Sequence, residues 1–158
     1  MNYIYNYVKE LCLFSRYYDV NDIVEYIGRS RALALPGFHK FTGDDLISSF
    51  LNRGKKTCWD IWIMYPAATT FFEALSNPQP DPGVFSEDPL RKICQTYVNK
   101  LYGFNDQTYV DEARLTGVVY GGKDFTNIPP SSDALHQKVL RSAFQVQFVL
   151  IKLNEFLK

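Results

Sequence analysis

The sequence predicts one mainly helical domain, an α/β fold in which α-helix dominates and the only sheet is small and N-terminal. Apolar side chains recur at steps of three and four along several segments, as they do on the buried face of an α-helix. Prolines and glycines stand between these segments, where helices commonly begin or end. The 158 residues are 46% hydrophobic, which is enough for a sizeable core, so residues 1–158 are predicted to form a single domain.

Two strong helical patterns flank a short polar segment. In the first, Pro36 is expected in the opening turn and Gly43 just past the end, around the apolar positions Leu33, Leu35, Phe38 and Phe41. The second helix is expected to begin at Arg53-Gly54-Lys55-Lys56 and to stop at Pro66, with an apolar face of Cys58, Ile61, Trp62 and Tyr65.

The rest of the chain, residues 66–158, is predicted to be a helical extension with a hinge at the proline-rich connection 77–83. Helices are expected around 68–75, from Asp88 to near Gly103, and over 111–119. A long helix is expected over about 133–156, capped by Ser132 or Asp133. Its apolar stripe is Leu135, Val139, Ala143, Val146, Leu150, Leu153 and Leu157, and it is widened by Leu140, Phe144, Phe148 and Ile151, so we expect the helix to lie centrally in the core. The alternative is that this helix offers an interface to a protein partner.

Two adjacent carboxylates, Asp44 and Asp45, are expected at the end of the first helix. Proteins bind Mg²⁺ through oxygen, often with one or two carboxylates together with water and phosphate. Asp45, with Asp44, is therefore a candidate metal ligand and catalytic residue. Two neighbouring aspartates make a poor metal cage by themselves, and such a pair after a glycine is most often a helix cap or a turn.

A basic glycine turn follows ten residues after Asp44. The first N–H groups of a helix have no intrahelical partner, so Gly54 with Arg53, Lys55 and Lys56 is a candidate anchor for the phosphates of DNA. The alternative is an ordinary solvated helix start. Seventeen basic and seventeen acidic residues give a formal net charge of zero, so any such binding must be local, weak and sensitive to salt.

Composition favours a folded intracellular protein, compatible with a nuclear location. Three scattered cysteines do not make a disulfide framework, and two histidines give no zinc spacing. The sequence shows no secretory signal and no apolar run of about 18 residues, so we expect no membrane association.

The segment ALPGFHKFTGDDLISSFLNRGKKTCWDIW, residues 34–62, resembles a pattern in a family of uncharacterised, transposon-associated animal proteins, approximately LPAFHAFTGCDTVSSFAGKGKKTAWKVW. The similarity continues in LYGFNDQTYVDEARLTGVVY, which matches LYG-type and NEAR-type segments. It extends to NIPPSSDALHQKVLRSAFQVQF, where the family has IPPT and then aLxxHvxRAxYQ. Together the matches cover about residues 10–148. This family is in turn distantly similar to PIN-like and flap-endonuclease-like nucleases.

The resemblance implies roles for individual residues. Asp45 matches the metal-binding aspartate of a G-[CS]-D-Y turn, and Asp44 stands where the family usually has Cys. Residues 52–58 match a helix–turn–helix module that grips duplex backbone, although Asn52 and Arg53 replace part of its glycine pattern and Cys58 replaces its alanine. Residues 1–65 would then be a partial PIN-like region.

The acid-bearing first strand of the related nucleases is missing from this chain. Residues 10–15 match the second strand, with 17–20 as its expected partner in a small sheet, and residues 21–27 match the next helix. Because two-metal hydrolysis needs several converging carboxylates, we expect no nuclease activity from this chain alone. The missing strand would also leave a strand edge exposed to a protein partner.

The sequence leaves three functions open. The first is non-catalytic binding of nucleic-acid backbone by a degenerate nuclease-like domain, without sequence specificity. The second is a protein–protein interaction module with no nucleic-acid role. The third is a Mg²⁺-dependent, structure-specific nuclease, which would need more acids than the sequence offers.

Overall fold

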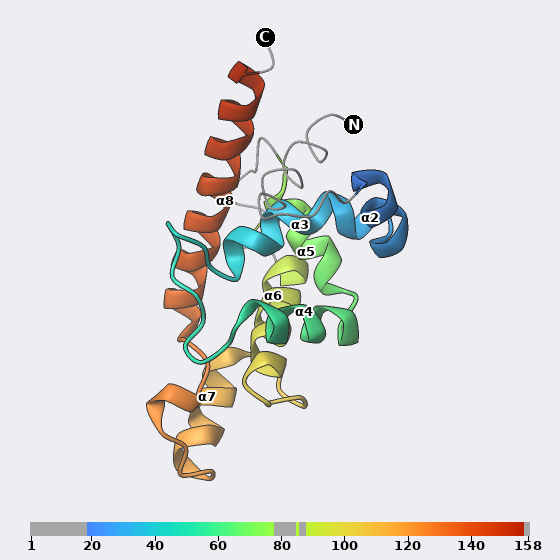
Figure 1. The fold of residues 1–158 in the computed structure, drawn as a ribbon. Coiled ribbons are helices and arrows are strands. Elements are labelled where there is room, and N and C mark those ends of the chain that lie inside the picture. The colour runs from blue at the N-terminus through green and yellow to red at the C-terminus, as the bar shows by residue number, and fades with distance from the viewer. Residues whose placement is uncertain (1–18, 78–84, 86–87, 157–158) are drawn as a thin grey trace.

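The computed structural model describes residues 19–77, 85 and 88–156 of the chain. This part forms seven α-helices and one short 3-10 helix, which confirms the mainly helical prediction (Figure 1). The elements are α2 (Val20–Ile27), α3 (Arg29–Phe41), α4 (Lys55–Met64), α5 (Ala68–Leu75), α6 (Asp88–Leu101), α7 (Val110–Val119), η2 (Phe125–Asn127) and α8 (Ser132–Phe156).

The described residues contain no β-strand, and their one extended pairing is an isolated bridge between Phe50 and Arg53. The predicted strand 10–15 lies outside the described residues, as does nearly all of the hinge 77–83. Residues 17–20 were expected to form the partner strand of 10–15. This expectation is wrong at Val20, which begins α2. Asp19 caps that helix by accepting a hydrogen bond of 2.8 Å from the Asn21 N–H, and a capped start favours helix over strand.

An aromatic core joins α3 to the three helices that follow it. Phe38 of α3 stacks on Trp62 of α4, with ring centroids 4.8 Å apart, and Trp62 meets Phe72 of α5 edge-on at 5.0 Å. Tyr97 of α6 completes the cluster, and its hydroxyl donates a 2.8 Å bond to the carbonyl of Cys58. Such aromatic contacts add to the free energy gained by burying the rings.

Helix α3 starts earlier than the sequence predicts. It begins at Arg29, directly after Gly28 at φ 82°, so Pro36 lies inside the helix rather than in its first turn. A proline there removes one hydrogen-bond donor from the helix. The next residue, Gly37, donates its N–H to the Ser76 hydroxyl at 2.8 Å, so this turn of α3 is bonded to the end of α5.

The remaining helix boundaries follow the predicted pattern closely, with one correction at α8. Its cap is Ser131, whose hydroxyl accepts a 3.3 Å bond from the Ala134 N–H, rather than Ser132 or Asp133. Ser132 instead bonds to the Asp111 carboxylate through both its N–H, at 3.1 Å, and its hydroxyl, at 2.6 Å. The start of α8 is thereby tied to α7.

Helix α8 packs on α3 and α5 with one face only, so it lies along the side of the core rather than at its centre (Figure 1). The buried face is the predicted stripe Leu135, Val139, Ala143, Val146 and Leu150. Of the four residues that widen this stripe, Leu140 is half-buried. The other three stay exposed, because no described helix covers them: Phe144, Phe148 and Ile151. The expectation of a central helix is therefore wrong.

Candidate functional site

The predicted metal and phosphate residues lie in the connection between α3 and α4 and in the first turn of α4. The chain leaves α3 through Thr42 and reverses at Gly43, whose φ of 102° favours glycine. A Cβ at Gly43 would lie 2.5 Å from the Ser49 Cα, so the loop also folds tightly against itself there. This confirms that Gly43 lies just past the end of the helix.

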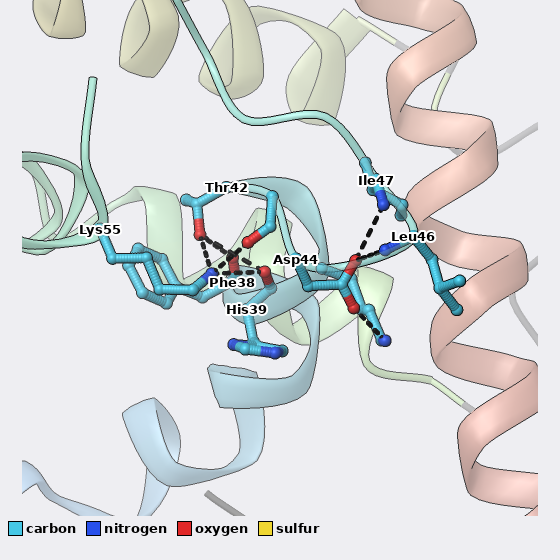
Figure 2. A network of polar contacts seen from close by, with 9 residues as sticks. Phe38, His39, Thr42, Asp44, Leu46, Ile47 and Lys55 are labelled. Carbon is cyan, nitrogen blue, oxygen red and sulfur yellow. Dashed lines mark hydrogen bonds and ion pairs between the residues drawn. The ribbon is translucent and has the colours of Figure 1, made fainter. Parts of the chain in front are cut away.

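Asp44 organises the first turn of this loop. Its Oδ1 accepts bonds from the N–H groups of Leu46, at 3.0 Å, and Ile47, at 2.9 Å, while its own N–H donates to the Ile47 carbonyl (Figure 2). Its Oδ2 pairs with the Lys40 ammonium, and both side chains are about nine-tenths covered. Burial alone would raise the pKa of Asp44, but the bonds from Lys40, Leu46 and Ile47 hold the pKa below its usual value.

Asp45 has quite different surroundings from Asp44. It is exposed, and it forms no hydrogen bond or ion pair with the residues that the structure describes. Among those residues, no three side chains of His, Cys, Asp or Glu gather where they could share a metal ion. The Asp44 carboxylate is thus surrounded by protein donors, while Asp45 faces solvent.

Lys55, the first residue of α4, points back to the end of α3. Its ammonium donates to the carbonyls of His39, at 2.8 Å, and Gly43, and to the Thr42 hydroxyl, at 3.0 Å (Figure 2). These carbonyls end a helix and carry partial negative charge, so a cation there stabilises it. Burial of the ammonium, reinforced by the nearby Lys40, lowers the pKa of Lys55.

The other basic residues of the turn are placed differently. Arg53 donates from Nε to the Leu101 carbonyl at 2.8 Å, and its guanidinium lies 4.7 Å from the centre of the Tyr102 ring. Lys56 projects into solvent with 88% of its side chain exposed, paired with Asp60 at 2.7 Å. Gly54 precedes α4 without a capping side chain, and a Cβ there would meet no atom within 4 Å.

Asn52 gives this turn its shape. Its φ of 57° is the one positive value among the described non-glycine residues, and the turn is closed by the Arg53 N–H bonding to the Phe50 carbonyl at 3.0 Å. Asparagine is one of the few residues that adopt this left-handed conformation readily. Asn52 therefore supplies a glycine-like backbone at this turn.

His39 lies beside these cations, and we expect it to make the fold sensitive to acid. Burial, with the charges of Lys55 and Lys40, lowers the pKa of His39 from 6.5 to about 4. Between these two pH values the unfolded chain binds a proton that the folded chain does not, so stability falls as the pH falls through this window. Between pH 6.5 and 4 the free energy of unfolding should fall less in His39→Gln than in the parent protein. Urea unfolding followed by circular dichroism measures it at each pH.

The matched control is His136→Gln on α8, which should keep the acid sensitivity of the parent protein. Stability curves of the parent and His39→Gln that run parallel from pH 6.5 to 4 would contradict this role of His39.

Sequence reasoning missed a second basic region. The loop 46–51, the segment 125–130 and the first half of α8 enclose a groove of about 780 Å³, lined on its basic side by Arg114, Lys138 and Arg141. The available signal was the spacing of Lys138 and Arg141, three residues apart on one predicted helix. Arg114 joins them only through the fold.

Comparison with known proteins gave no match to a family model, to a curated protein or to a solved structure. None of the helices in the described part of the chain is both long and apolar enough to cross a membrane.

Proposed function

We propose that this chain binds the backbone of nucleic acid without sequence preference, as a non-catalytic module, at the start of α4. One observation carries the proposal: α4 opens without a capping side chain, beside a glycine with open space and an exposed lysine, Lys56. The first N–H groups of a helix have no intrahelical acceptor, and the helix dipole favours an anion there.

Each residue of the turn has a separate part in this proposal. Gly54 lets a phosphate approach the N–H groups. Lys56 adds a positive charge, and its ammonium leaves the Asp60 carboxylate to pair with the phosphate. Lys55 and Arg53 hold the turn on α3 and α6 through the bonds described above. Asn52 keeps the glycine-like turn, which agrees with the resemblance to a backbone-gripping helix–turn–helix module of a PIN-like domain.

The binding should be weak and fall steeply with salt, because only a few phosphates are contacted. We expect Lys56→Glu to weaken binding to a fluorescently labelled mixed-sequence DNA duplex and to reduce the slope of log affinity against log salt by about 1. Fluorescence anisotropy at several salt concentrations measures both quantities. Lys92→Glu, an exposed lysine of α6, is the matched control for charge reversal and should leave the salt slope unchanged.

Equal effects of Lys56→Glu and Lys92→Glu would overturn the proposed contact, as would no binding of duplex at low salt. The same titration with Mg²⁺ tests the nuclease alternative. Cleavage that needs Mg²⁺ and is lost in Asp45→Asn would replace the non-catalytic proposal with a metal site at Asp45.

The protein-interaction alternative is favoured by a separate observation, the groove beside α8, because exposed apolar side chains line it together with cations.

A further inference from the structure

The groove is built from three segments that are distant in sequence. Lys138 of α8 joins one wall to another, because its ammonium donates to the Ser48 carbonyl and lies 4.6 Å from the centre of the Phe50 ring. On the opposite side, Arg114 of α7 donates to the Pro129 carbonyl at 2.6 Å. These bonds hold the walls in place, so the groove is preformed rather than a gap between loose loops.

The groove carries an excess of positive charge. Arg114, Lys138 and Arg141 line it against one carboxylate, Asp133, and none of the three cations forms an ion pair with a described carboxylate. Lys138 and Arg114 bond to backbone carbonyls rather than to carboxylates. Arg141 is exposed and forms no hydrogen bond with a residue in the described part of the chain. A ligand that complements the groove is therefore anionic.

Between these cations the groove exposes apolar side chains, beside polar ones such as Ser48 and Gln137. Leu46 and Leu51 of the loop are 68% and 55% exposed, and Phe125 of η2 is 76% exposed. Beneath them lie the buried side chains of Phe50 and Ile128. Nucleic-acid bases stack on aromatic side chains, and Phe125 is the one exposed aromatic residue among those named here. The aliphatic side chains of Leu46 and Leu51 instead suit the apolar side chains of a peptide.

We propose that this groove binds an extended acidic segment of a partner protein. Its Asp or Glu carboxylates would pair with Arg141 and Lys138, while apolar side chains between them pack on Leu46 and Leu51. Successive side chains of an extended peptide point to opposite sides, so alternating acidic and apolar residues reach the two walls. This inference goes beyond the proposed nucleic-acid contact and uses a different surface.

Lys138 provides a local readout of occupancy. Its burial, together with the charges of Arg141 and Lys55, lowers its pKa to about 8. A bound carboxylate would favour the charged ammonium and raise this pKa. Nuclear magnetic resonance of the lysine side chains, with Lys138→Met for assignment, follows the change directly.

The test uses a labelled short peptide of alternating glutamate and leucine, with a glutamine–leucine peptide of the same length as its neutral control. We expect salt-sensitive binding of the acidic peptide, about tenfold weaker binding in Arg141→Glu, and a raised pKa of Lys138 on binding. Lys92→Glu is the matched control for Arg141→Glu and should bind the peptide like the parent. Lys56→Glu should also leave peptide binding unchanged, which separates this groove from the contact at α4.

The inference would be overturned by equal affinity for the acidic and neutral peptides, by no binding of the acidic peptide at low salt, or by an unchanged affinity in Arg141→Glu. Binding of oligothymidylate that is lost in Arg141→Glu, without binding of the acidic peptide, would also overturn it and assign the groove to nucleic acid.

Discussion

Asp44→Ala is expected to lower the free energy of unfolding by about 3 kcal/mol, the lower end of the range for removing one partner of a buried ion pair. The substitution leaves the Lys40 ammonium without its carboxylate in a site where about nine-tenths of the lysine side chain is covered. It also removes the acceptor for the N–H groups of Leu46 and Ile47. Urea unfolding followed by circular dichroism measures the loss.

Two further variants separate the causes. Asp44→Asn keeps an oxygen for the two N–H groups but removes the charge, so it should lose less stability than Asp44→Ala. Asp45→Ala, at the neighbouring exposed carboxylate, should change stability by no more than about 0.5 kcal/mol. A stability loss shared equally by Asp44→Ala and Asp45→Ala would contradict the structural role assigned to Asp44.

The comparison also bears on the metal hypothesis. A carboxylate that serves only to hold a cation is often destabilising in the metal-free protein, so its removal leaves stability unchanged or raises it. A large loss at Asp44, as expected, assigns that residue to the loop and leaves Asp45 as the residue on which the Mg²⁺ hypothesis rests.

Local signals in the sequence predicted the ends of α3 and α4 well. Gly43 and Pro66 act through the backbone of their own residues, so their effect does not depend on the rest of the fold. Pro36 was misplaced because α3 begins at Arg29, earlier than its apolar pattern predicts. The bond from the Gly37 N–H to the Ser76 hydroxyl, which joins this turn to α5, is a tertiary contact that the pattern of a single helix does not reveal.

The candidate site shows the same division between local and distant information. The sequence identified Asp44, Lys55 and their spacing, but it did not show which groups these two side chains bond to. Lys55 bonds to atoms 12 to 16 residues away, and Arg114 of α7 lines the same groove as Lys138 of α8 only because the fold brings these distant segments together. Contacts of this kind decide whether a charged side chain faces a ligand or the protein itself.

Gly37→Ala is expected to destabilise the protein by about 2 kcal/mol or more, because an added Cβ has no room between α3 and α5. That Cβ would lie 2.2 Å from the Phe72 carbonyl oxygen and 2.8 Å from the Leu75 Cβ. The closest neighbour is backbone, so relief requires the two helices to separate, which weakens the Gly37 N–H bond to Ser76. Alanine favours a helix interior by about 1 kcal/mol over glycine, but this gain does not offset the clash.

Gly54→Ala provides the control for Gly37→Ala, since a Cβ there meets no atom within 4 Å and its backbone φ of −73° suits any residue. Its loss of stability should be about 1 kcal/mol or less, the ordinary cost of alanine at a helix start. Thermal and urea unfolding of both variants measure the difference. If Gly37→Ala is no less stable than Gly54→Ala, the close approach of α3 and α5 is wrong. The Lys40, His39 and Lys55 contacts would then lose their support, since all three residues sit on or against the last turns of α3.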